Sequence, residues 1–149
     1  MIYMTENQMC EEERPEDNRY RIIICGGKSD LGKDVYDTFI SAVLASLGAK
    51  DCEIVSGGCR GADLAGERYA AEHGLALSRF PADWKTFGRS AGIKRNAEMI
   101  NYISQFPRSA VIAFWNGESR GTGFTIRQAE KKNIDVYIYR YTSLDKSGK

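Results

Sequence analysis

Short apolar runs alternate along this chain with segments of helical periodicity. The clearest run, Arg21–Cys25, reads Arg-Ile-Ile-Ile-Cys and is followed by the glycine pair Gly26-Gly27. An uninterrupted β-branched run is typical of a parallel strand that helices cover on both faces. The same reasoning predicts four further strands, at Glu53–Ser56, Leu75–Phe80, Ala110–Phe114 and Asp135–Tyr139.

The segments between these runs favour helices. Apolar residues from Tyr36 to Leu47 recur at helical spacing, and Gly48 provides a stop. Strands that alternate with helices imply right-handed crossovers and a parallel sheet. We therefore predict an α/β, Rossmann-like, doubly wound fold with about five parallel strands and helices on both faces. The other predicted segments are helices from Ala62 to His73 with Gly74 as C-cap, from Ile93 to Ser104 and from the loop Asn116–Gly121 to Lys132-Asn133, and a loop over Pro81–Gly92.

The chain of 149 residues fits a single domain. Residues 1–19 are polar and acidic and lack apolar periodicity, so we expect a disordered tail there. Residues 20–141 form the predicted domain, and 142–149 a second short tail. No apolar stretch approaches the roughly 20 residues that span a bilayer, and no signal peptide is evident, so we expect a cytoplasmic protein with no membrane partner.

Several kinds of chemistry are disfavoured by composition. The chain has four cysteines without a C-x-x-C pair and a single histidine, His73, so we expect neither a metal ion nor a cofactor. His73 lies in the last turn of a predicted helix, where a role as dipole partner is favoured over a catalytic base. A net charge of +1 gives no global reason to expect a polyanionic partner.

Three glycine-rich loops follow predicted strands and precede predicted helices. Glycine permits close approach of a ligand to the backbone, and a helix N-terminus favours a phosphate. Arg60 and Arg120 could add bidentate contacts to that phosphate, and Asp63 is expected to cap the helix that it opens. Tight turns alone are the alternative explanation for the glycines. The candidate ligand-binding residues are Gly26, Gly27 and Lys28 in the first loop, Gly57, Gly58, Arg60, Gly61 and Asp63 in the second, and Gly117, Arg120, Gly121 and Thr122 in the third.

A fourth segment, Pro81 to Asn96, adds three candidates. Arg95 could contact a phosphate or carboxylate, and Asn96 a ribose hydroxyl or a base edge. Trp84 could stack on a base, although a role as a core or lid anchor is slightly favoured.

The ordered motifs Ser56-Gly57-Gly58-x-Arg60-Gly61-Ala62-Asp63, Ala82-Asp83-Trp84, Ala91-Gly92-x-x-Arg95-Asn96 and Gly121-Thr122 resemble the SLOG superfamily, in particular its small YspA-like members. The resemblance runs from about Arg21 to Tyr139. LOG-type relatives are phosphoribohydrolases that cleave the N-glycosidic bond of nucleoside 5′-monophosphates, and Arg95 matches their arginine. Their catalytic glutamate does not match, because Thr125 stands at that position, and Glu118 or Glu98 would have to supply the carboxylate. DNA-processing protein A, another relative, loads recombinase on single-stranded DNA.

These observations leave three functions open. The first is a sensor or sequestering module for a nucleotide or nucleotide-derived phosphate ligand, because the phosphate loops stand beside a missing carboxylate. The second is a phosphoribohydrolase with Arg95 as a catalytic residue. The third is single-stranded DNA binding, which the neutral total charge disfavours. LOG relatives dimerise, which keeps a homodimer open as well.

Overall fold

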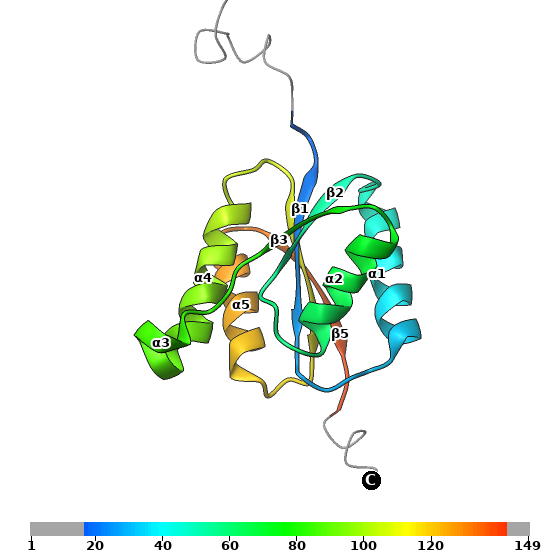
Figure 1. Cartoon of the computed structure of the whole chain (residues 1–149). Helices are drawn as coiled ribbons and strands as arrows, with labels where there is room; N and C mark the ends of the chain where they lie inside the picture. The colour runs from blue at the N-terminus through cyan, green and yellow to red at the C-terminus, as the bar shows by residue number, and fades with distance from the viewer. Residues whose placement is uncertain (1–16, 143–149) are drawn as a thin grey trace, which may run out of the picture.

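A computed structural model describes residues 17–142, so most of the tails predicted over residues 1–19 and 142–149 lies outside the described part. Strands and helices alternate from β1 to β5, as the sequence predicts (Figure 1). The elements are β1 (Tyr20–Gly26), α1 (Lys33–Leu47), β2 (Cys52–Ser56), α2 (Ala62–Glu72), β3 (Ala76–Arg79), α3 (Trp84–Phe87), the 3-10 helix η2 (Gly88–Ser90), α4 (Ala91–Ile103), β4 (Ser109–Trp115), α5 (Arg120–Lys131) and β5 (Asp135–Arg140).

The five strands form one parallel sheet in the order β3-β2-β1-β4-β5. Helices α1 and α2 cover one face, and α4 and α5 cover the other (Figure 1). The predicted doubly wound, Rossmann-like fold is therefore confirmed. The chain leaves β1 toward one face of the sheet and leaves the neighbouring β4 toward the other, so a topological switch point lies between these two strands.

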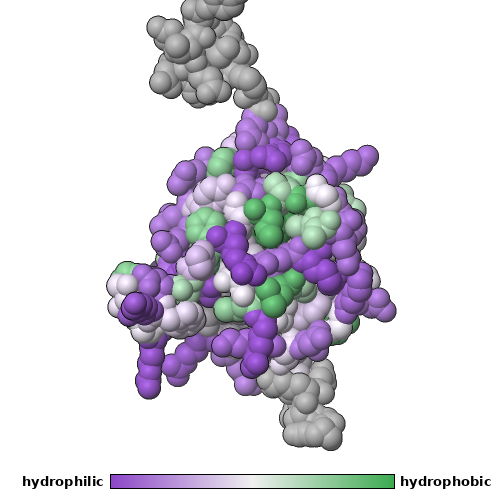
Figure 2. All heavy atoms as spheres, viewed as in Figure 1, coloured by the Kyte–Doolittle hydropathy of each residue, from purple (hydrophilic) through white to green (hydrophobic). Residues whose placement is uncertain are grey.

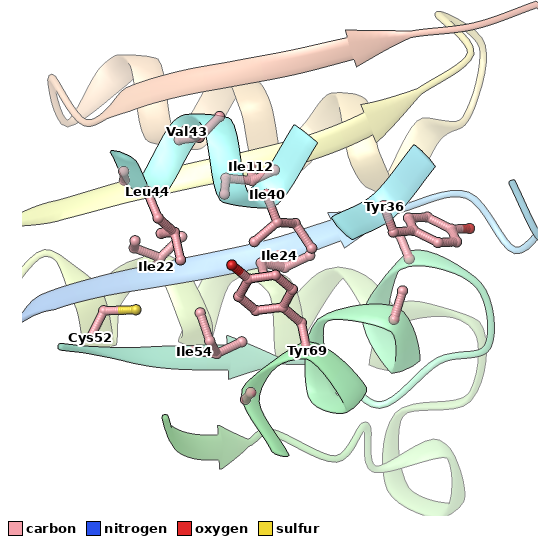
Figure 3. Close-up of a cluster of buried hydrophobic side chains, with 14 of the residues drawn as sticks. Ile22, Ile24, Tyr36, Ile40, Val43, Leu44, Cys52, Ile54, Tyr69 and Ile112 are labelled. Carbon is pink, nitrogen blue, oxygen red and sulfur yellow. The ribbon is translucent and has the colours of Figure 1, made fainter. Parts of the chain in front are cut away.

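Alternate residues of β1 pack into two hydrophobic cores, one on each face of the sheet. Ile22 and Ile24 point at α1, whose Ile40, Val43 and Leu44 pack over them (Figure 3). Ile23 faces α4 and α5 in the second core. Because both faces of the strand are covered, its sequence is continuously apolar instead of alternating.

Several predicted boundaries are wrong. The segment Pro81–Gly92, predicted as a loop, contains α3, η2 and the start of α4, because the Asp83 side chain accepts a hydrogen bond from Thr86 N at 3.1 Å and caps α3. Helix α5 begins at Arg120, inside the predicted loop Asn116–Gly121. Helix α2 ends at Glu72, and His73 is its C-cap, with Nδ1 3.0 Å from Tyr69 O.

A buried ion pair lies near the amino ends of β1 and β2. Arg21 Nε donates to Glu53 Oε1 at 2.8 Å, and both side chains are buried. Burial pushes the pKa of Glu53 upward, but hydrogen bonds from Ser78, Tyr102 and Arg21 outweigh it and hold that pKa below its ordinary value. Arg21 also pairs with Asp17, which ties the first described residues to the sheet.

No helix within residues 17–142 is long and apolar enough to cross a membrane.

Candidate functional site

A cavity of about 580 Å³ opens at the carboxyl ends of β1 and β4, the ends that point toward the lower edge of Figure 1. It therefore lies at the switch point of the sheet, where α/β proteins bind ligands. We call it the Arg95 pocket. Its lining consists of Cys25, Gly26, Gly27, Lys28, Ser29, Cys59, Arg60, Asp63, Arg95, Asn96, Asn116, Ser119, Gly121, Thr122, Thr125 and Tyr141.

The β2–α2 loop is held by its own side chains. Ser56 Oγ accepts a hydrogen bond from Gly58 N at 3.0 Å, and Asp63 Oδ2 accepts one from Cys59 N at 3.3 Å. The expectation that Asp63 caps α2 is wrong, because Gly61 is the N-cap and the helix has no side-chain capping hydrogen bond. Asp63 instead turns back to the preceding loop and fixes its backbone.

Arg95 is 6% exposed and reaches this loop from α4. Its Nη1 donates to Gly57 O, its Nη2 lies 3.6 Å from Cys59 Sγ, and its Nε donates to Asn96 Oδ1 at 2.8 Å. A Cβ at position 57 would lie 2.7 Å from Arg95 Cζ and 2.8 Å from Asp63 Oδ2. Glycine is therefore required there by the packing of two charged side chains.

Asp63 lines the pocket beside Arg95 and is 5% exposed. Burial raises the pKa of Asp63 from 3.8 to about 6, because the charged form loses hydration. The hydrogen bond from Cys59 N and the charge of Arg95 oppose this rise, while the nearby Glu67 adds to it. A carboxyl that titrates near neutrality inside a pocket is a candidate functional group.

The β1–α1 loop lies directly against the β2–α2 loop. Ala62 N donates to Gly27 O at 3.3 Å, and a Cβ on Gly61 would collide with Gly27 O and lie 2.8 Å from Lys28 Cα. Gly61 also has φ +86°, so both this close approach and the backbone conformation require glycine at position 61. This close approach brings Lys28 and Arg60 to one wall of the pocket.

The third side of the pocket is the start of α5. Asn116 Oδ1 accepts hydrogen bonds from Glu118 N at 2.8 Å and Ser119 N at 2.9 Å, which shapes the β4–α5 loop. Asn96 Nδ2 donates to Gly121 O at 3.3 Å, so Asn96 links Arg95 to α5. Thr125 is fully buried and donates to the same carbonyl at 3.1 Å.

The structure brings together most of the candidates chosen from the sequence. The residues that line the pocket are Gly26, Gly27, Lys28, Arg60, Asp63, Arg95, Asn96, Gly121 and Thr122. The residues that do not line it are Gly57, Gly58, Gly61, Trp84, Gly117 and Arg120.

The candidates outside the lining have other places. Gly57 and Gly61 shape the β2–α2 loop, and Gly58, with φ +77°, lies beneath Arg79, whose Nε would be 3.0 Å from a Cβ there. Gly117 packs against the guanidinium of Arg140. Trp84 is 56% exposed on α3, where it lies against Gly92, and Arg120 is exposed in the first turn of α5.

Tyr141 is the lining residue that sequence reasoning missed most clearly. It follows β5, and its hydroxyl lies over Gly27, 2.5 Å from where a Cβ would stand. The rule that ligands bind at carboxyl ends of strands would have found it, had it been applied to the last strand. The other unselected lining residues are Cys25, Ser29, Cys59, Asn116, Ser119 and Thr125.

Within residues 17–142, no three His, Cys, Asp or Glu side chains are grouped so that they could hold a metal ion. The described cysteines Cys25, Cys52 and Cys59 are free thiols.

Comparisons with known proteins place this geometry in a family. A family model described as the YspA, cpYpsA-related SLOG family matches residues 20–87. The Gene 61 protein of Mycobacterium phage D29 is 35% identical to the chain over 88 residues, which cover 56% of this chain and 67% of the phage protein. The chain belongs to the SLOG superfamily. The SLOG match runs from β1 through α3 and so includes the loops that carry Lys28 and Arg60.

The X-ray structure of DNA processing protein A from Streptococcus pneumoniae is also similar to this SLOG protein. The two superpose with a TM-score of 0.55 at 17% sequence identity, over 85% of this chain and 52% of the other. This likeness shows a shared fold. The chain spans about half the length of that protein.

Proposed function

We propose that the Arg95 pocket binds a nucleotide or nucleotide-derived phosphate ligand and that the protein acts as a sensor or sequestering module. The observation that carries the proposal is the pair Lys28 and Arg60. Both are exposed, and within residues 17–142 neither has a hydrogen-bonded or ion-paired partner. Two unpaired cations beside the buried Arg95 favour an anion.

The rest of the lining supports a ligand with many hydrogen-bonding groups. Asn96, Thr122 and Ser119 add polar side chains, and the start of α5 adds the positive end of a helix dipole. A cavity of about 580 Å³ falls in the range of small-molecule sites, roughly 300 to 1,000 Å³.

The test is thermal unfolding of the protein against a panel of nucleoside mono-, di- and triphosphates and nucleotide-derived signals. A ligand at a hundredfold excess over its Kd stabilises the folded state by about 2.7 kcal/mol, which shifts the melting temperature measurably. Arg60→Ala should abolish the shift. Arg120→Ala is the matched control, because it removes an exposed arginine that does not line the pocket. Equal losses in both variants, or no shift with any compound, would refute the proposal.

Hydrolysis of a nucleotide N-glycosidic bond is a second candidate, and Asp63 is the observation that favours it. Such a reaction needs a carboxylate near an oxocarbenium-like transition state. Glu98 and Glu118 are exposed and do not line the pocket, and Thr125 carries no charge. Asp63 is the acidic side chain of the described residues that lines the Arg95 pocket.

Release of free base from nucleoside monophosphates, followed by chromatography, tests this candidate. Hydrolysis is expected to disappear in Asp63→Asn and to persist in Glu118→Gln. Binding without base release would leave the sensor as the function.

Single-stranded DNA is the weaker alternative. The exposed Trp84 and Phe87 lie in a segment that also carries Lys85, Arg89 and Lys94, a composition that could stack and neutralise a strand. Lys94 Nζ already lies 4.9 Å from the centre of the Phe87 ring, however. We expect oligodeoxythymidine to bind without the steep salt dependence of a true strand-binding groove.

A further inference from the structure

A second hollow adjoins the Arg95 pocket and shares a wall with it. It has a volume of about 560 Å³ and is lined by residues of the β1–α1 loop, α1, the β2–α2 loop and α2. We call it the Leu64 pocket. Lys28 and Arg60 line both hollows. The two unpaired cations therefore stand at the junction of the two pockets and not at the far end of one.

Close contacts and hydrogen bonds hold the backbone of the shared wall. Gly61, the neighbour of Arg60, lies against the backbone of Lys28. The β1–α1 loop is held by Tyr36, whose hydroxyl accepts a hydrogen bond from Leu31 N at 3.1 Å and donates to Ser29 O at 2.9 Å. Two cations on adjoining, fixed loops repel each other, so an anion placed between them gains from both.

The remaining cations of the Leu64 pocket are already neutralised. Lys33 Nζ pairs with Asp37 at 2.6 Å and with Glu72 at 3.2 Å. Arg68 pairs with the same two carboxylates, at 2.8 Å and 3.2 Å. This side of the hollow is therefore not built for a second phosphate, and its occupant should be uncharged.

The Leu64 pocket also has an apolar part beside these ion pairs. Leu64 is 41% exposed and lines the hollow together with Ala65, while Asp30 adds a carboxylate at its rim. Figure 2 shows apolar patches on the α2 and β3 face within a largely polar surface. A nucleoside has the matching chemistry, because its base offers an apolar face and its ribose hydroxyls can donate to a carboxylate.

We propose that the Leu64 pocket is a second nucleoside subsite and that the ligand consists of two nucleoside groups joined through phosphate. The linking phosphate lies between Lys28 and Arg60, one nucleoside fills the Arg95 pocket, and the other covers Leu64. This inference rests on the proposed function and narrows its ligand class.

Isothermal titration calorimetry with matched probes tests the inference. The probes are AMP and diadenosine diphosphate, in which a pyrophosphate joins two adenosines, with the corresponding guanine pair. The members of each pair carry a similar charge near neutral pH, so a difference in affinity reports the second nucleoside. We expect one joined compound to bind about tenfold or more tightly than its monophosphate, because its second half binds at high effective concentration.

The variant Leu64→Ala tests whether the higher affinity of the joined compound comes from the Leu64 pocket. It shortens an exposed side chain on a helix, so the fold is retained. It should remove most of the advantage of the joined compound and leave monophosphate binding unchanged. Leu77→Ala is the matched control, because Leu77 is 43% exposed and lines neither hollow.

The outcomes separate the two proposals. Equal affinity for monophosphate and joined compound, or an advantage that survives in Leu64→Ala, would overturn the second subsite while the proposed function stands. Weaker monophosphate binding in Leu64→Ala would place the single nucleoside in the Leu64 pocket and would also overturn the assignment. No binding by any probe would overturn the second subsite, and the thermal-unfolding panel then decides separately whether the proposed function stands.

Discussion

Asp63→Asn should change the pH dependence of stability in a defined direction. The pKa of Asp63 rises from 3.8 to about 6 on folding, so the folded protein holds the proton more tightly than the unfolded chain does. Between those pH values the folded state binds more protons, and the stability from Asp63 falls as pH rises. Above pH 6 the ionised carboxylate destabilises the folded state by about 3 kcal/mol relative to acidic solution.

The assay is urea unfolding of the wild type and Asp63→Asn from pH 4 to pH 8, followed by tryptophan fluorescence. The difference in unfolding free energy between the two proteins isolates this carboxyl, because groups that do not interact with Asp63 titrate equally in both. The asparagine keeps an oxygen that can accept the hydrogen bond from Cys59 N. The stability of the variant relative to the wild type should therefore rise by about 2 kcal/mol between pH 4 and pH 8, because part of the total effect falls below pH 4.

Asp135→Asn is the matched control, because it removes an exposed carboxylate at the start of β5. Its difference from the wild type should show no comparable change between pH 4 and pH 6. A flat difference curve for Asp63→Asn, or one that falls with pH, would refute the view that burial outweighs the neighbouring Arg95. The same curve would also remove the reason to regard Asp63 as a carboxyl that titrates near neutrality.

Three other changes have expected outcomes. Gly57→Ala should destabilise the fold by about 1 to 3 kcal/mol in urea unfolding, because the new Cβ meets the Arg95 guanidinium. Glu53→Ala should cost about 1 to 3 kcal/mol in the same assay, because the partly buried hydroxyls of Ser78 and Tyr102 lose their acceptor, while Arg21 loses one partner and keeps Asp17. Cys59 should be alkylated by iodoacetamide, with protection by bound ligand, whereas Cys25 should be spared, as peptide mass spectrometry would show, because burial raises the pKa of the Cys25 thiol.

Each of these three predictions has a control. Gly92→Ala lies in α4 where the new Cβ makes ordinary contacts, so it should be harmless or stabilising, and a loss equal to that of Gly57→Ala would contradict the packing argument. Arg79→Ala breaks an exposed pair with Glu67 and should matter far less than Glu53→Ala. Equal labelling of Cys59 with and without ligand would place the ligand elsewhere.

Strand positions and sheet architecture were predictable because both faces of β1, β2 and β4 are covered, so the central residues of each strand are buried and mostly apolar. The helical structure within Pro81–Gly92 was not predictable, because α3 is a single turn capped by Asp83 and shows no helical spacing of apolar residues. Helix α5 was predicted to begin too late, because its first residues, Arg120-Gly121-Thr122, have the composition of a loop. Apolar patterns in the sequence indicate which residues of a long strand or helix are buried, but a single turn is too short to show such a pattern.

The candidate site was predictable to the extent that chain order determines it. Residues that follow β1, β2 and β4 meet at one edge because parallel strands end together, and so Lys28, Arg60 and Gly121 were found. Which glycines touch a ligand was not predictable. Gly57 and Gly117 resemble phosphate-loop glycines in sequence, yet their space is taken by Arg95 and Arg140 from distant parts of the chain.

This difference changes how the glycine-rich motif should be interpreted. The amides of Gly58 and Cys59 are bonded to Ser56 and Asp63, so this stretch binds its own side chains first. Its glycines make room for Arg95 and for Lys28, which places fixed charges around the cavity. Discrimination between ligands should then depend on side chains that do not hold the loops through hydrogen bonds or packing contacts. Lys28 and Arg60 are the clearest of these, because replacing either removes charge from the pocket without removing a hydrogen bond that holds the loops.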